Sequence, residues 1–115
     1  NMDRQVAKGA ISEADKQAAL ANLSLETNLA IGVANADLVV EAATENVAIK
    51  LDIFKQIDAA APAHCILASN TSSISITKIG AATQRPNKVI GMHFMNPVPV
   101  MKLVEIINGY ATDAA

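Results

Sequence analysis

Cysteine and aromatic residues are scarce in this sequence. Cys65 is the only cysteine, so neither an internal disulfide nor a cluster of thiolates around a metal can form within the chain. A chain without disulfides suits a reducing compartment, which indicates the cytoplasm, or the mitochondrial matrix for a eukaryotic source. Two phenylalanines, one tyrosine and no tryptophan offer few surfaces on which nucleic-acid bases can stack. The core must therefore consist of aliphatic side chains, alanine and methionine.

Long hydrophobic runs and an excess of positive charge are also missing. No apolar stretch approaches the roughly 18 residues of a membrane-spanning helix, and the amino terminus lacks the basic-then-apolar pattern of a signal peptide. Nine basic residues against eleven acidic ones give a formal charge of -2, which offers little to a phosphate backbone. We therefore expect a soluble protein that binds a small molecule, and neither a nucleic-acid-binding nor a membrane protein.

The remaining composition is that of one globular domain. The chain has 115 residues, of which 51% are hydrophobic and 17% charged. This length favours a single compact domain, and the hydrophobic share is enough to bury a core. No repeat with a period of 20 to 50 residues indicates a solenoid.

Residues 1–22 are predicted to form a helical hairpin. Residues 1–8 suit a helix, and Gly9 can end it in the left-handed conformation that glycine adopts readily. Ser12 can cap a second helix, with Asp15 three residues later completing a capping-box pattern. Alanine and leucine then supply high helix propensity.

The rest of the chain alternates between apolar strands and helices. Parallel neighbouring strands need a crossover connection, usually a helix, so this alternation predicts an α/β fold with a mostly parallel sheet. Nearly continuous apolar strands indicate helices on both faces. The predicted strands are 37–43, 65–69, 89–94 and 101–107, and the predicted helices are 45–61, capped by Thr44 and ended by Pro62, and 76–83.

Three polar clusters follow the predicted strands, at residues 44–50, 69–73 and 93–96. Ligands of open α/β sheets bind beyond the carboxyl ends of the strands. His93 lies at such an end, and Pro97 and Pro99 favour a reversal that can bring Glu105 beside its imidazole. A carboxylate on one ring nitrogen fixes the tautomer and leaves the other nitrogen to accept a substrate proton. The alternative is a polar strand end with an unrelated exposed glutamate.

Other polar residues carry weaker signals. The hydroxyl cluster around Ser72 can direct hydrogen bonds or simply cap a helix, and it lacks the nucleophile-elbow pattern of serine hydrolases. Glu45 and Lys50 can line the rim of a cleft or be surface charges. Arg4 and Lys8 share a helix face, where they can meet a phosphate or merely solvate the helix.

Two further residues have simpler interpretations, and no metal site is expected. His64 precedes a strand and is expected to be structural or solvated. Cys65 lies within an apolar strand and is expected to be a small buried side chain. No spacing of histidine, cysteine and carboxylate residues resembles a metal site.

Three segments together resemble the 3-hydroxyacyl-CoA dehydrogenase family, which includes bacterial 3-hydroxybutyryl-CoA dehydrogenases. They are VVEAATENVAIK, ASNTSSISIT and IGMHFMNPVPVMKLVE, in the family's order and spacing. The opening DRQVAKGAISEADK resembles the family's helical hairpin. The resemblance covers nearly the whole chain. It implies a Rossmann-like domain that uses NAD to interconvert (S)-3-hydroxyacyl-CoA and 3-oxoacyl-CoA, a reaction of fatty-acid β-oxidation and butanoate metabolism.

The resemblance also implies roles for single residues. His93 matches the catalytic base, and Glu105 matches its electrostatic partner. Ser72 matches the residue that hydrogen-bonds the reacting oxygen at the cofactor and substrate sites. Asn96 matches a residue of the nicotinamide and substrate site.

Further positions match the binding sites of the two large ligands. By resemblance, Glu45 and Lys50 line the NAD site. Lys8 and Asn1 match positions near the coenzyme A nucleotide. Met95 stands where phenylalanine is usual in the family, which we expect to alter packing rather than chemistry.

One family feature is missing from these residues. The family begins with a strand and a G-x-G-x-x-G turn that approaches the dinucleotide pyrophosphate, but the five glycines here are dispersed. By resemblance, residues 1–115 are the central and C-terminal part of the NAD-binding domain, without its first βαβ unit and without the helical carboxyl-terminal domain that forms most of a homodimer contact. We expect this segment alone neither to bind NAD tightly nor to turn over.

Two alternatives to this function are kept. One is a related Rossmann dehydrogenase that acts on a different hydroxy acid and lacks the coenzyme A contacts. The other is a non-catalytic binding or assembly module that retains the motifs without the chemistry.

Overall fold

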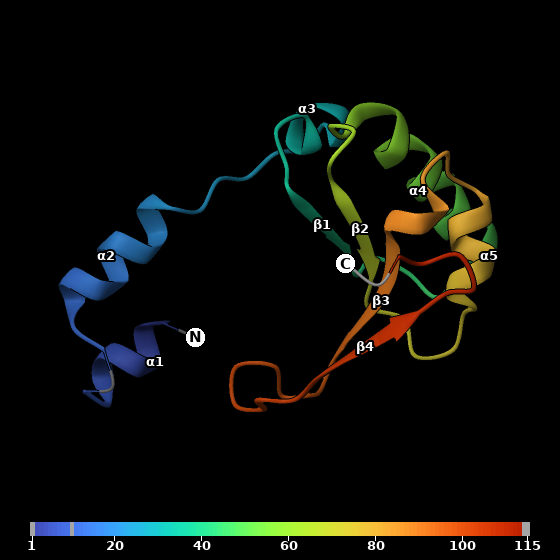
Figure 1. The fold of residues 1–115 in the computed structure, drawn as a ribbon. Helices are drawn as coiled ribbons and strands as arrows, with labels where there is room; N and C mark the ends of the chain where they lie inside the picture. The colour runs from blue at the N-terminus through green and yellow to red at the C-terminus, as the bar shows by residue number, and fades with distance from the viewer. Residues whose placement is uncertain (1, 10, 114–115) are drawn as a thin grey trace.

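A four-stranded sheet with helices forms the body of the protein (Figure 1). The computed structural model describes residues 2–9 and 11–113. The strand order is β1-β2-β3-β4, in which β1–β2 and β2–β3 are parallel and β3–β4 is antiparallel. The predicted α/β class with a mostly parallel sheet is confirmed. The elements in chain order are α1 (Met2–Ala7), α2 (Glu13–Ala21), α3 (Leu29–Val33), β1 (Leu38–Glu41), α4 (Val47–Ala60), β2 (Ile66–Ser69), α5 (Ile76–Ala81), the 3-10 helix η1 (Pro86–Lys88), β3 (Val89–Phe94) and β4 (Val104–Asn108).

The helical hairpin forms as the sequence predicts. Gly9 has a φ of 75°, the left-handed conformation that ends α1. Ser12 accepts a hydrogen bond from the Asp15 backbone N–H, and the Asp15 carboxylate accepts one from the Ser12 N–H, which completes a capping box. The hairpin stands apart from the sheet and is joined to it by an extended segment (Figure 1). It therefore contributes little to the core.

Helix α4 begins two residues later than predicted. Thr44 does not cap it; Asn46 does, by accepting a hydrogen bond from the Ile49 backbone N–H. Thr44 instead accepts a hydrogen bond from the Asn46 N–H, which holds the turn that enters the helix. Apolar residues recur along α4 at spacings of three and four; Phe54 and Ile57 among them are buried, whereas Ile49 is 53% exposed.

Arg85 holds the opposite end of α4. Its guanidinium donates to the backbone oxygens of Asp58 and Ala61 and to those of Pro62 and Cys65 in the loop that follows. Its Nε also donates to the Asp58 carboxylate at 2.6 Å. The last carbonyls of a helix have no intrahelical partner, so this one side chain satisfies the helix end and anchors β2.

The core lies between the sheet and helices α4 and α5. Phe54 and Ile79 from these helices and Leu67 and Val89 from the sheet are each 0% exposed. Gly91 is needed where α5 approaches β3, because a Cβ there would lie 3.0 Å from both Ile76 Cδ1 and Ile107 Cβ. This close approach places the start of α5 directly over the sheet.

The opposite face of the sheet is apolar and exposed. Leu38, Val40, Ile66 and Ile106 are between 37% and 57% exposed, and the register places them on the same face. Within residues 2–9 and 11–113, α4 and α5 pack on the other face. The helices expected on both faces are therefore seen here on one face only.

The sequence pattern does not predict α3. This helix has five residues, which is too short for an apolar stripe to repeat. Asn28 caps it by accepting a hydrogen bond from the Ile31 backbone N–H. No described helix is long and apolar enough to cross a membrane.

Candidate functional site

Polar residues gather where β1, β2 and β3 end. The loop from Ala42 to Asn46 follows β1, and the loop from Asn70 to Ser75 follows β2. In parallel strands these ends lie at one edge of the sheet, where α/β proteins bind ligands. The antiparallel strand β4 brings Glu105 to the end of β3.

His93 and Glu105 are brought together by the pairing of β3 and β4. The two residues are direct register partners, so their side chains leave the same face of the sheet. Nδ1 of His93 lies 3.4 Å from Oε1 of Glu105. The His93 side chain is 28% exposed and the Glu105 side chain 52%. Glu105 is exposed, as the alternative interpretation holds, but the strand pairing brings it within reach of Nδ1, and Nε2 of His93 is left for another partner.

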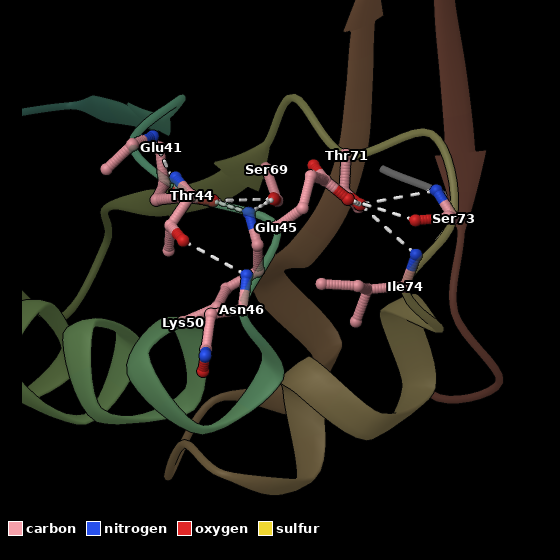
Figure 2. A network of polar contacts seen from close by, with 10 residues as sticks. Glu41, Thr44, Glu45, Asn46, Lys50, Ser69, Thr71, Ser73 and Ile74 are labelled. Carbon is pink, nitrogen blue, oxygen red and sulfur yellow. Dashed lines mark hydrogen bonds and ion pairs between the residues drawn. The ribbon is translucent and has the colours of Figure 1, made fainter.

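Glu41, Lys50 and Ser69 form a buried polar cluster, which we call the Glu41 triad (Figure 2). The Lys50 ammonium is paired with the Glu41 carboxylate, and their side chains are 1% and 2% exposed. Lys50 also donates to Ser69 Oγ at 3.1 Å, and Ser69 donates to Glu41 at 2.8 Å. Lys50 is thus neither a surface charge nor an exposed rim residue. It joins the first turns of α4 to the ends of β1 and β2.

The pKa of Glu41 lies below its ordinary value. Burial alone would raise it, because it penalises the charged form. Hydrogen bonds from Lys50, Ser69 and the Ala43 backbone N–H, together with the Lys50 charge, outweigh burial and lower the pKa. The triad therefore holds an ionised carboxylate inside the protein.

Glu45 bridges the hydroxyl groups on either side of Ser72 (Figure 2). Its Oε2 accepts hydrogen bonds from Thr71 Oγ1 at 2.9 Å and from Ser73 Oγ at 3.0 Å. Thr71 is 1% exposed, and its hydroxyl oxygen accepts bonds from the backbone N–H groups of Ser73 and Ile74. The conformation of the loop that carries Ser72 is therefore fixed by a residue of the β1–α4 loop.

Ser72 itself is exposed, as is Asn96. Ser72 lines a shallow hollow together with the following residues of its loop and with Ile107 and Asn108 of β4. Asn96 is the second residue after β3. Ser72 lies in the loop after β2 and Asn96 in the loop after β3, so both loops leave the sheet at the end where His93 lies.

A small cavity lies between the loop that follows β1, the start of α4 and Asn70. Its volume is about 260 Å³. Ala42 and Ala43, which follow β1, lie along the cavity. Lys50 of the Glu41 triad forms part of the cavity wall. It is lined by Ala42, Ala43, Thr44, Glu45, Lys50 and Asn70.

The structure does not bring the hairpin residues to this site. Lys8 is exposed and follows α1, in the hairpin that stands apart from the sheet (Figure 1). Asn1 lies outside the described residues. Arg4 belongs to α1. The helix face that Arg4 and Lys8 were expected to share is therefore part of the hairpin and does not lie at the strand ends.

His64 and Cys65 lie at the other end of the sheet. His64 is exposed and its Nε2 lies 2.7 Å from Asp37 Oδ1. Burial raises the pKa of the Cys65 thiol, and the side chain is 0% exposed, as expected for a small core residue. Among the described residues, no three histidine, cysteine or carboxylate side chains are placed to hold a metal ion.

Sequence reasoning missed Glu41 and Asn70. Glu41 is an acidic residue within an apolar strand, and a buried charge requires a partner of opposite charge. This acidic residue could have indicated that a basic residue such as Lys50 is buried beside it. Asn70 carried no such signal, because a polar residue in a turn is ordinary. Only the structure shows that Asn70 contacts β3.

Comparison with known proteins places these features in a family. The family model for the NAD-binding domain of 3-hydroxyacyl-CoA dehydrogenase matches residues 1–115. A probable 3-hydroxybutyryl-CoA dehydrogenase of Bacillus subtilis is 51% identical over 109 residues, which are 95% of this chain and 38% of that protein. A 3-hydroxybutyryl-CoA dehydrogenase of Clostridioides difficile is 48% identical over 112 residues, 97% of this chain and 40% of that protein.

A solved structure gives the same result. The crystal structure of (S)-3-hydroxybutyryl-CoA dehydrogenase from Ralstonia eutropha superposes with a TM-score of 0.93 at 51% identity. The match covers 98% of this chain and 40% of that one. The chain thus spans about two fifths of the length of these relatives.

Proposed function

Because this chain belongs to the family of 3-hydroxyacyl-CoA dehydrogenase NAD-binding domains, we propose that the full-length protein interconverts (S)-3-hydroxyacyl-CoA and 3-oxoacyl-CoA. The observation that carries this proposal is the contact between His93 Nδ1 and Glu105 Oε1 at 3.4 Å, at the ligand-binding edge of the sheet. A histidine oriented by a carboxylate is the arrangement that a general base requires. The relatives named for 3-hydroxybutyryl-CoA favour a short acyl chain.

The cofactor of this family is NAD, and the cavity fits one end of it. At about 260 Å³ the cavity is smaller than a typical pocket for a whole ligand, so it would accept only part of the dinucleotide. The exposed Glu45 makes both of its described bonds through Oε2, so Oε1 would accept a bond from a ribose hydroxyl. When bound, NAD supplies the hydride acceptor.

Lys50 would contribute to the cofactor site without being exposed. Its ammonium has three donors, and two of them are used by Glu41 and Ser69. The third would serve a ligand oxygen at the cavity wall. Its main task would be to keep the wall rigid through the Glu41 triad.

His93 would remove the hydroxyl proton of the substrate. In the tautomer that donates Nδ1–H to Glu105, Nε2 carries the free electron pair and accepts the proton. The imidazolium so formed is stabilised by the Glu105 carboxylate. Ser72 would donate a hydrogen bond to the reacting oxygen, and Asn96 would orient the reacting groups, since both are exposed at the same strand ends.

The coenzyme A part of the substrate would be bound elsewhere. Lys8 is exposed on the hairpin, where its charge would attract a nucleotide phosphate; from the resemblance we place Asn1 near the same nucleotide. A homodimer of the full-length protein and a location in the cytoplasm or the mitochondrial matrix are part of the same proposal.

The test is a steady-state assay of the full-length protein. We expect reduction of NAD with (S)-3-hydroxybutyryl-CoA, and little with free 3-hydroxybutyrate or with other hydroxy acids. Lys8→Ala should raise KM for the acyl-CoA with little change in kcat, because it removes binding energy remote from the reaction. Equal activity on the free hydroxy acid would favour a different hydroxy-acid dehydrogenase, and no activity on any hydroxy acid would favour a binding module.

A further inference from the structure

Asn70 connects the loop that carries Ser72 to the strand that carries His93. It is the first residue after β2, and its backbone N–H donates to the Glu41 carbonyl at 2.8 Å. Its side-chain Oδ1 accepts a hydrogen bond from the Phe94 backbone N–H at 2.9 Å. One residue thus contacts the end of β1 and the end of β3.

The contact with Phe94 extends the sheet beyond its last paired residues. The β2–β3 ladder ends at Ser69 and Gly91, three residues before Phe94. β2 ends at Ser69, and beyond that point the Asn70 amide oxygen accepts the hydrogen bond from the Phe94 backbone N–H. A backbone N–H left without an acceptor in a partly buried position costs free energy, so this bond sets where the end of β3 lies.

The position of β3 matters because His93 precedes Phe94. The Asn70 loop continues through Thr71 to Ser72, and Glu45 already fixes this loop through Thr71 and Ser73. The hydrogen bond from the Phe94 backbone N–H to Asn70 Oδ1 links this fixed loop directly to the strand that carries His93.

We propose that Asn70 is a positioning residue that holds His93 in register with Ser72. This inference rests on the proposed dehydrogenase function. A displacement of about 1 Å in a catalytic group can cost about 100-fold in rate. Loss of the Asn70 acceptor should therefore lower kcat more than it changes KM.

The experiment compares two substitutions in the full-length protein. Asn70→Leu has a similar branched shape but no acceptor, whereas Asn70→Asp retains an acceptor oxygen for the Phe94 N–H. Steady-state kinetics with NAD and (S)-3-hydroxybutyryl-CoA gives kcat and both KM values. Hydrogen exchange of the Phe94 amide, measured by mass spectrometry of short peptides, reports the bond independently of activity. Asn87→Leu is the matched control, because Asn87 is exposed and bonds to Asp113.

For Asn70→Leu we expect kcat to fall about 10- to 100-fold, KM for the acyl-CoA to change less than about threefold, and the Phe94 amide to exchange faster. Asn70→Asp should keep the slow exchange and lose less of kcat than Asn70→Leu, and Asn87→Leu should leave kcat and the Phe94 amide unchanged. If leucine prevents folding, Asn70→Ala, which also lacks the acceptor, carries the same expectation.

Three results would overturn the inference. The first is a normal kcat in Asn70→Leu despite faster exchange, and the second is exchange that stays slow in that variant. The third is a kcat in Asn70→Asp as low as in the leucine variant while Phe94 stays protected, which would indicate direct ligand contact. An inactive wild-type protein would instead refute the proposed function.

Discussion

His93 and Glu105 face one another across the antiparallel strands β3 and β4, with Nδ1 of the imidazole 3.4 Å from Oε1 of the carboxylate. Twelve residues separate them in the sequence, and the reversal between the strands makes them direct partners. The sheet register makes the two residues neighbours, and their side-chain rotamers set the distance between the two atoms. Apo-state hydrogen bonds of catalytic pairs are often long and shorten when ligands bind.

His93→Gln should lower kcat by at least about 100-fold, within the range expected for loss of acid-base catalysis. Glutamine is of similar size but cannot accept a substrate proton at neutral pH. Steady-state kinetics of the full-length protein checks this, with NAD binding measured by fluorescence. His64→Gln is the control, since His64 is exposed at the other end of the sheet. A kcat within threefold of wild type would refute the role of His93.

Glu105→Gln should lower kcat less than His93→Gln, by about 10- to 100-fold, since it leaves the base in place but removes the charge that stabilises the imidazolium. The measurement is kcat at saturating NAD and acyl-CoA, with the thermal midpoint as a check on folding. Glu13→Gln, on the exposed hairpin, serves as control. If Glu105→Gln has full activity, Glu105 has no part in the reaction.

Glu45→Leu should impair the reaction more than Glu45→Gln. Leucine leaves the hydroxyls of Thr71 and Ser73 without their shared acceptor, which frees the loop around Ser72, whereas the glutamine oxygen can still accept from both. We expect kcat to fall about 10-fold or more for leucine and less than about threefold for glutamine. Equal losses in the two variants would show that the charge of Glu45, rather than its acceptor oxygen, matters.

Glu41→Leu should reduce the free energy of unfolding by about 3–5 kcal/mol, because it leaves the Lys50 ammonium buried without its partner. The double variant Glu41→Leu/Lys50→Met should recover much of this loss, since no charge then remains in the interior. Urea unfolding of the full-length proteins gives both values. Additive losses in the double variant would mean that the two side chains are not energetically coupled.

The contribution of Glu41 should also depend on pH. Its pKa is lowered in the folded state relative to the ordinary value of 4.5, so the folded state favours the ionised form. The stabilisation is complete above the unfolded pKa and is lost as the pH falls through the lower folded pKa. The stability difference between wild type and Glu41→Gln should therefore be constant from pH 6 to 7 and shrink below about pH 4.5. A difference that grows on acidification would contradict the lowered pKa.

The local features of the fold were predictable from sequence. Gly9 ends α1 and Ser12 caps α2, because these effects involve residues within one helical turn. The apolar run from Val89 to Phe94 coincides with β3. Thr44 shows the limit of such reasoning: both Thr44 and Asn46 are good capping residues, and only the path of the chain after β1 decides between them.

Sequence patterns alone predicted the α/β alternation, the strand ends at which we propose that ligands bind, and that Glu105 could reach His93. These depend on hydrophobic periodicity and chain reversal over short separations. Tertiary structure alone decided that Lys50 is buried against Glu41, that Glu45 holds the loop around Ser72, and that Asn70 contacts Phe94. Those partners lie 9 to 28 residues apart, and a hydrogen bond forms between them only after packing of the sheet against α4 and α5 has fixed where each strand ends.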